Sequence, residues 1–215
     1  MKLLALSSSG PLPSAALFAD GALVYEALGQ GGKTHSETLM PLVEQALSAA
    51  GLAPNQADVF AVDIGPGSFT GVRIGVCAAN AMAMAKERPV VGVSSLRALL
   101  HGLEGPACAL LDCRNGNGYA MVLGGSGEIL LAESAVVVAE LLPTVPAGTL
   151  FIGDGAALYR EKILQAVAGA HFCEDNAVTA AKVGRCALGE KGEREVMPLY
   201  LRPSQAERLW REKRP

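Results

Sequence analysis

The order of predicted strands and helices occurs twice along the chain, and this repeat constrains the fold more than any other feature of the sequence. Three short apolar runs between residues 3 and 26 precede a helical pattern, which a further strand and helix follow. After Gly105 the same order returns, beginning with apolar runs at residues 108–112 and 119–123. Residue identity between the halves is slight, so the repeat is one of pattern. It predicts an α/β fold of two similar β-β-β-α-β-α lobes with a cleft between them.

The repeat divides the chain into three parts. We expect an N-terminal lobe at residues 1–104, a C-terminal lobe at residues 105–191, and a tail at residues 192–215 that is either a packing segment or a solvated arm. Half of the 215 residues are hydrophobic and 18% are charged, which is typical of a globular protein with a buried core. The net charge of −3 gives no overall attraction to phosphate, so nucleic acid would have to be bound by a local basic patch or through a partner protein. The slightly acidic balance favours a partner.

The sequence favours a cytoplasmic protein. Its first apolar run ends after Leu6, too early for a signal peptide. No apolar run approaches the roughly 18 residues that a membrane-spanning helix needs. The five cysteines are an odd number without the C-x-x-C spacing of many metal sites, and we expect them to be reduced.

A helix is predicted to begin after Thr34. Glu37 follows Thr34 by three residues, which is the pattern of a capping box. Apolar residues then recur at helical spacing, among them Leu39, Leu42 and Val43. Periodicity alone favours a core-facing helix, and a partner-binding face would give the same stripe, so both interpretations stay open here.

A glycine-rich segment before this helix resembles a phosphate-binding loop. Residues 27–34 differ from G-x-x-x-x-G-K-[ST] in the first position, where Ala27 replaces glycine. The preceding strand is predicted to be the second strand of a hairpin. A glycine-rich connector between that strand and the helix, with Thr34 as the N-cap, therefore accounts for the pattern. We therefore favour a structural connector over nucleotide binding.

The run from Gly65 to Gly75, GPGSFTGVRIG, is the longest motif in the chain. It matches neither G-x-G-x-x-G nor the Walker pattern. Glycines around the stiff Pro66 predict a sharp strand-to-helix turn, capped by Ser68 or Thr70. Arg73 lies near the start of the helix, where a cation opposes the helix dipole, so we expect it to bind a ligand phosphate, a partner carboxylate or a nearby loop carbonyl.

The residues typical of catalysis are dispersed. His35, His101 and His171 show no helical zinc spacing, which argues against a metallopeptidase. Asp63, Asp112 and Asp154 lie near predicted strand ends or loops. Such carboxylates hold magnesium in two-lobed kinases, and they also commonly cap backbone amides, which is the interpretation we favour.

The GPGSFTGVRIG run closely resembles the signature of the TsaB (YeaZ) family. Its loop residues are Gly65, Pro66, Gly67, Ser68, Thr70 and Gly71. Further matches spread over most of the chain: His35–Glu37 with Leu39 and Pro41, Gly92–Leu96, Pro198–Arg202, and Ala206–Glu207.

The resemblance implies an actin-like ASKHA fold and a noncatalytic role in tRNA threonylcarbamoyladenosine synthesis. The expected partners are the paralogous catalytic subunit TsaD and the ATPase TsaE, with a homodimer when TsaD is absent and tRNA bound only through the complex. That assembly transfers threonylcarbamoyl to N6 of adenosine 37 in tRNAs that read ANN codons. No cofactor is implied, although a nucleotide at the partner interface stays open. The resemblance places the partner contact on two helices, at His35, Leu39, Leu42, Val43, Phe69, Arg73, Ile74 and Cys77.

Three departures from related sequences weaken the enzymatic alternatives, a metallopeptidase (glycoprotease) and a small-molecule kinase of the same fold. The first strand ends in Ser7–Ser9, where relatives commonly place Asp-Thr-Ser. The Asp-Ala-Arg of the second lobe reads Asp112–Arg114, with cysteine in the middle. The paired histidines that bind metal in the catalytic paralogue are absent, with only His35 in a comparable region.

Overall fold

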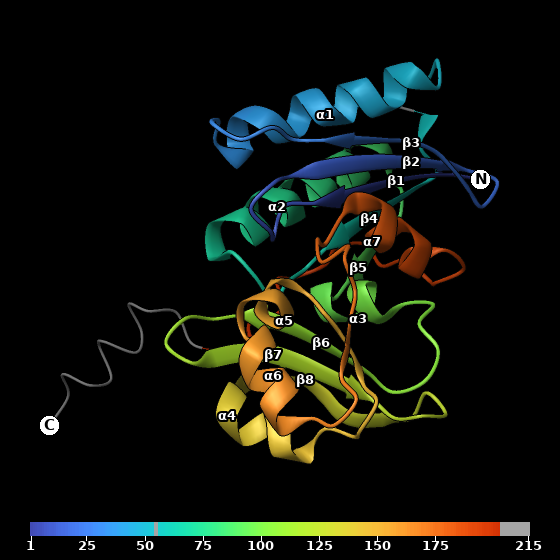
Figure 1. Ribbon diagram of the computed structural model, residues 1–215. Coiled ribbons are helices and arrows are strands. Elements are labelled where there is room, and N and C mark those ends of the chain that lie inside the picture. The colour runs from blue at the N-terminus through green and yellow to red at the C-terminus, as the bar shows by residue number, and fades with distance from the viewer. Residues whose placement is uncertain (54–55, 203–215) are drawn as a thin grey trace, which may run out of the picture.

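The computed structural model describes residues 1–53 and 56–202, which fold into two lobes, each built on a five-stranded sheet (Figure 1). The first sheet has the order β3-β2-β1-β4-β5. Its strands are β1 (Lys2–Ser7), β2 (Ser14–Ala19), β3 (Ala22–Leu28), β4 (Val59–Asp63) and β5 (Val90–Val93). The first three strands are antiparallel, whereas β4 and β5 run parallel to β1.

The second sheet repeats this arrangement in the order β10-β9-β6-β7-β8. Its strands are β6 (Ala107–Asp112), β7 (Asn117–Leu123), β8 (Ile129–Val137), β9 (Leu150–Ile152) and β10 (His171–Phe172). The pairing is again antiparallel for β6, β7 and β8, and parallel for β6, β9 and β10. The predicted duplication of an α/β unit is therefore confirmed at the level of topology.

Helices cover both sheets. They are α1 (His35–Ala49), α2 (Phe69–Lys86), α3 (Ser95–Leu100), α4 (Val138–Leu141), the 3-10 turn η2 (Leu142–Thr144), α5 (Asp154–Leu158), α6 (Arg160–Ala166) and α7 (Ala180–Ala187). The sequence pattern at residues 156–168 predicts one helix, but the chain forms two, α5 and α6, with a break at Tyr159. This break places the Tyr159 ring in the core of the second lobe, where its hydroxyl donates to Asp112. In the described part of the chain, no helix combines the length and apolar character needed to cross a membrane.

The start of α1 forms as its sequence predicts. The Thr34 backbone N–H donates to the Glu37 carboxylate at 2.9 Å, which completes the capping box. The helix packs against β2 and β3. Its apolar stripe faces this sheet, so the core interpretation of the periodicity is correct.

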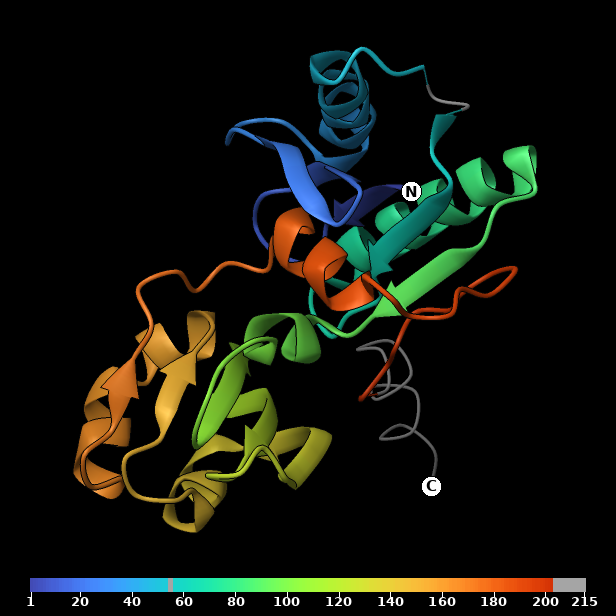
Figure 2. The ribbon, with the colours of Figure 1, turned by 90° about the vertical axis from the view of Figure 1, so that its right-hand side faces the viewer.

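Two helices cross between the lobes (Figure 2). α7 follows the second sheet along the chain but packs against β1, β2 and β4 of the first. α3 follows the first sheet but packs against β6 and β7 of the second, and it also contacts α7. The sequence pattern assigned the α7 segment to the second lobe, whereas the helix covers the sheet of the first. A pattern along the chain shows the order of the elements, but it does not show which sheet a helix covers. The lobe boundaries drawn from the sequence stay predictions.

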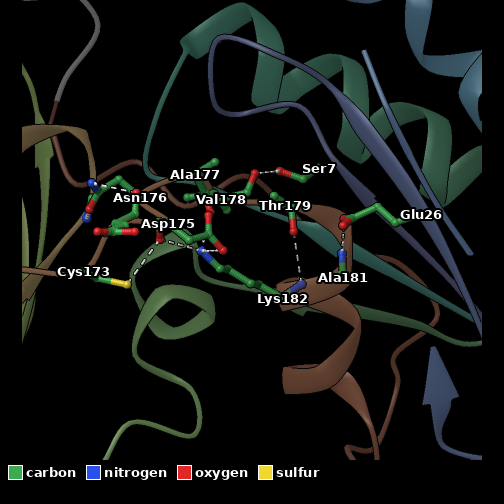
Figure 3. A network of polar contacts seen from close by, with 12 residues as sticks. Ser7, Glu26, Cys173, Asp175, Asn176, Ala177, Val178, Thr179, Ala181 and Lys182 are labelled. Carbon is green, nitrogen blue, oxygen red and sulfur yellow. Dashed lines mark hydrogen bonds and ion pairs between the residues drawn. The ribbon is translucent and has the colours of Figure 1, made fainter.

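Polar contacts fix the crossover segment at residues 173–179 (Figure 3). Lys182 of α7 donates to the carbonyl of Asp175 at 2.9 Å and to that of Ala177 at 2.7 Å, and it forms an ion pair with the Asp175 carboxylate. The first amide of α7, at Ala180, donates to Ser14 Oγ, and the next amide donates to Glu26 at 2.7 Å. The start of α7 is thus bound to the first lobe while its lysine holds the returning chain.

We predict that Gly184→Ala destabilises the protein by roughly 1–2 kcal/mol in a urea titration. A Cβ at Gly184 would overlap the ring of Phe18, which is buried on β2. This overlap outweighs the gain of up to about 1 kcal/mol that alanine brings to a helix interior. Gly125→Ala is the matched control, because no atom lies within 4 Å of its added Cβ. Equal stability of the two variants would contradict the packing of α7 on β2.

Candidate functional site

A cleft lies between the lobes at the carboxyl ends of several strands. The first lobe lines it with the loop after β1 and with the glycine loop after β4. The second lobe contributes the loop after β6 and Asp154 at the start of α5. In open parallel sheets ligands bind in crevices at such strand ends, so the position is one where a two-lobed enzyme would hold its substrate. The lining residues are Ser9, Gly10, Pro11, His35, Pro66, Gly67, Ser68, Leu111, Asp112, Cys113, Arg114, Tyr119, Asp154 and Val178.

Asp63 at the end of β4 is buried beneath this cleft. Its carboxylate accepts hydrogen bonds from the hydroxyls of Ser7 at 3.0 Å and Ser95 at 2.6 Å, from the Ser9 hydroxyl, and from the Gly65 amide at 2.9 Å. Both carboxylate oxygens are occupied by these contacts. Asp63 therefore joins the loop after β1, the glycine loop and α3, and it does not offer an oxygen to the cleft.

Burial governs the charge of this group. Loss of solvation raises the pKa of Asp63, and the hydrogen bonds from Ser9, Ser95, Gly65 and Ser7 offset part of that rise. A carboxylate with a raised pKa and no free oxygen is suited to a structural role.

The two other candidate carboxylates also bind the chain itself. Asp112 accepts hydrogen bonds from the Arg114 amide at 3.1 Å and the Tyr159 hydroxyl at 2.8 Å. Asp154 accepts from the Asp112 amide at 2.9 Å. Within residues 1–53 and 56–202, no group of three histidine, cysteine, aspartate or glutamate residues is arranged to hold a metal ion. The capping interpretation of these aspartates is the one that the geometry favours.

The glycine loop is a tightly packed turn. Gly65 has a φ of 94°, and a Cβ at Gly67 would lie 2.7 Å from the Ser9 carbonyl. A Cβ at Gly71 would overlap the Ser8 carbonyl. Glycine is needed here because the turn adopts a positive φ and lies against the loop after β1. Of the two predicted caps, Ser68 is the one that accepts the α2 amide, from Gly71 at 3.2 Å.

Several residues predicted to contact a partner are buried in this chain. Leu39, Leu42 and Val43 are 1%, 6% and 3% exposed, because the α1 stripe that contains them faces the first sheet. These three residues offer no surface to a partner, so the prediction that they contact one is wrong. His35 is half-buried, and its Nε2 lies 2.8 Å from the Gly10 carbonyl oxygen at the cleft.

The predicted contact residues on α2 lie at the surface. Phe69, Arg73 and Cys77 are exposed, and Ile74 is half-buried. With Ala81 and Met84, the exposed residues follow one another at helical spacing and form what we call the α2 stripe: Phe69, Arg73, Cys77, Ala81 and Met84. Arg73 is the only charged member of this otherwise apolar set.

The acceptor expected for Arg73 lies within the chain. Its Nε donates to the Tyr200 hydroxyl at 2.7 Å. Its guanidinium carbon lies 3.8 Å from the centroid of the Phe69 ring, in cation–π contact. Tyr200 was not predicted as a site residue, although it lies in the Pro198–Arg202 run that carries part of the family resemblance.

We predict a stability effect of Asp63 that depends on pH. Because the pKa of Asp63 is raised in the folded state, the unfolded chain loses this proton first as pH rises above about 4. The stability of the wild type should therefore fall relative to Asp63→Asn as pH increases through that window, by at most about 1.4 kcal/mol per pH unit. Urea titrations at several pH values measure the difference in free energy of unfolding between the two proteins. The contributions of titratable groups common to both proteins cancel in this difference. A difference that is constant or changes in the opposite direction would contradict the raised pKa.

The chain is similar to known proteins over almost its whole length. The family model described as TsaD, tRNA N6-adenosine threonylcarbamoyltransferase, matches residues 30–198. The tRNA threonylcarbamoyladenosine biosynthesis protein TsaB of Bacillus subtilis is 29% identical, over 98% of each chain. The protein of that name in Haemophilus influenzae is 28% identical, over 94% of each chain. The solved structure of YeaZ from Pseudomonas aeruginosa is 28% identical and superposes with a TM-score of 0.75, covering 93% of this chain and 99% of that one.

Proposed function

Since the chain belongs to the family of tRNA N6-adenosine threonylcarbamoyltransferase, and within it to the TsaB (YeaZ) proteins of actin-like fold, we propose that it works as the scaffold and activator of a threonylcarbamoyl transferase complex. It takes part in tRNA threonylcarbamoyladenosine biosynthesis. The finer role that we propose is to bind and activate the paralogous subunit TsaD, together with TsaE, for transfer to N6 of adenosine 37 in tRNAs that read ANN codons.

The observation that carries this proposal is the exposed α2 stripe. Phe69 is 42% exposed and Met84 is 72% exposed, although both are large apolar side chains. They lie toward opposite ends of the exposed face of α2. Large apolar side chains gathered on one face commonly mark a surface that another protein covers. We propose that TsaD covers it, and that a second copy of this chain covers it when TsaD is absent.

The cleft supports a noncatalytic role. The loop after β1 carries serines where a nucleotide-using relative would place a carboxylate, and Ser7 and Ser9 bind the buried Asp63. Asp112 and Asp154 bind backbone amides. Each of the three aspartates thus binds groups of the chain itself. We therefore propose that the chain needs no cofactor of its own, acts in the cytoplasm, and meets tRNA only through the complex.

We predict that Ala81→Glu weakens binding to TsaD at least tenfold. Ala81 lies between Cys77 and Met84 in the α2 stripe, so a carboxylate there would be buried without a partner in the complex. Ala157→Glu is the matched control, because it makes the same change at an exposed helical alanine of the second lobe. Biolayer interferometry with immobilised TsaD measures both. Equal affinity of the two variants would remove the α2 stripe as the binding surface.

Reconstitution tests the role itself. Modified tRNA is measured with TsaD and TsaE in the presence and absence of this chain. The proposed function predicts that modification depends on the chain and is lost with Ala81→Glu at concentrations where Ala157→Glu still supports it. Rapid ATP hydrolysis or peptide cleavage by the isolated chain would contradict the scaffold role.

A further inference from the structure

The segment that follows α7 returns to the first lobe and runs along its surface. We call residues 190–202 the C-terminal strap. Its backbone pairs with the edge strand β5, where Val90 and Glu193 exchange two hydrogen bonds at 2.9 and 2.8 Å. The strap thereby covers an edge that would otherwise present unpaired backbone groups.

Further along, the strap is attached to α2 and to Ile64, which lies between β4 and the glycine loop. The Asn80 side chain binds both backbone groups of Val196, donating to its carbonyl at 2.9 Å and accepting from its amide at 3.1 Å. The Leu199 amide donates to the Ile64 carbonyl at 2.8 Å. These anchors fix the path of the strap up to Leu199.

Tyr200 comes directly after the last of these anchors and lies against the start of α2. Its ring centroid is 5.2 Å from that of Phe69 and 5.6 Å from the guanidinium carbon of Arg73. Arg73 therefore contacts two aromatic rings and donates Nε to the Tyr200 hydroxyl. Tyr200 itself is 46% exposed, and the anchors before it already close the sheet edge. The contact with Arg73 is thus separate from the covering of β5.

The remaining donors of Arg73 have no partner among the residues that the structure describes. In the described part of the chain, its terminal nitrogens form no hydrogen bond or ion pair, and the side chain is exposed. A guanidinium whose orientation is fixed by stacking and by one hydrogen bond presents a planar pair of N–H groups. This geometry matches the two oxygens of a carboxylate.

We propose that Tyr200 is a positioning residue of the partner-binding face, which holds the Arg73 guanidinium so that it receives a carboxylate of the partner. This inference rests on the proposed function, because it takes the α2 stripe as the surface that TsaD covers. It adds the C-terminal strap to that surface. It also specifies the matching surface of the partner, which should be apolar and carry an acidic side chain opposite Arg73. An ordered cation at the edge of an apolar stripe would fix the register of the two proteins.

A double-mutant cycle on TsaD binding tests the proposal. Dissociation constants are measured by isothermal titration calorimetry for the full-length wild type, Tyr200→Ala, Arg73→Ala and the double variant. We expect Tyr200→Ala to weaken binding about tenfold in the wild-type background and less than twofold in the Arg73→Ala background, because Tyr200 acts through Arg73. Tyr200→Phe keeps the ring and loses the hydroxyl, so it should lie between wild type and Tyr200→Ala.

Salt dependence gives a second readout that a merely structural role of Tyr200 would not change. Binding of the wild type should weaken as sodium chloride rises from 50 to 500 mM, and this dependence should be smaller for Arg73→Ala and for Tyr200→Ala. Thermal unfolding of every variant should remain close to that of the wild type, since the pair is exposed.

The outcomes separate this inference from the proposed function. If the wild type binds TsaD but Tyr200→Ala has no effect, or has the same effect in both backgrounds, the positioning role is wrong and the scaffold role stands. If the wild type binds no TsaD, the proposed function fails and this inference fails with it. A large loss of thermal stability in Tyr200→Ala would show that the residue supports the fold and would also overturn the positioning role.

Discussion

One buried carboxylate connects the segments on which the cleft and the glycine loop depend. Asp63 ends β4, and its two oxygens accept hydrogen bonds from the serine that ends β1, from Ser9 in the following loop, from the amide of Gly65 and from the first turn of α3. Ser7 extends the network to the Val178 carbonyl, on the segment that returns from the second lobe. Since a buried carboxylate is costly without such donors, these segments must stay together for the carboxylate to be tolerated. The network explains why the glycine loop, whose sequence resembles a ligand-binding loop, has a structural role.

Much of the fold was predictable because its signals are local. The capping box at Thr34 and Glu37, the turn at Asp20 and Gly21, and the alternation of strands and helices depend on residues close in sequence. The duplicated sheet order follows from the repeat of these local signals. The role of the glycines in the Gly65–Gly75 run could also be predicted, because a sharp turn before a helix needs residues without a side chain.

The site was harder to predict because its contacts are distant in sequence. Arg73 finds its acceptor 127 residues away, at Tyr200, and no periodicity connects these two positions. The α1 stripe was ambiguous for a different reason. Helical spacing shows that Leu39, Leu42 and Val43 share one face, but whether that face meets the chain's own sheet or a partner depends on packing of the whole domain. The structure turns them inward and leaves Phe69 and Met84 outside.

The crossing of α3 and α7 makes each half of the duplication depend on the other for its core. One apolar cluster contains Leu3 and Phe18 of the first sheet, Ala109 and Ile152 of the second, and residues of both crossing helices. Each half of the duplication therefore completes its core with a helix from the other half. A lobe separated from the other would lack the helix that packs on its sheet, and it would expose part of the shared apolar cluster to water.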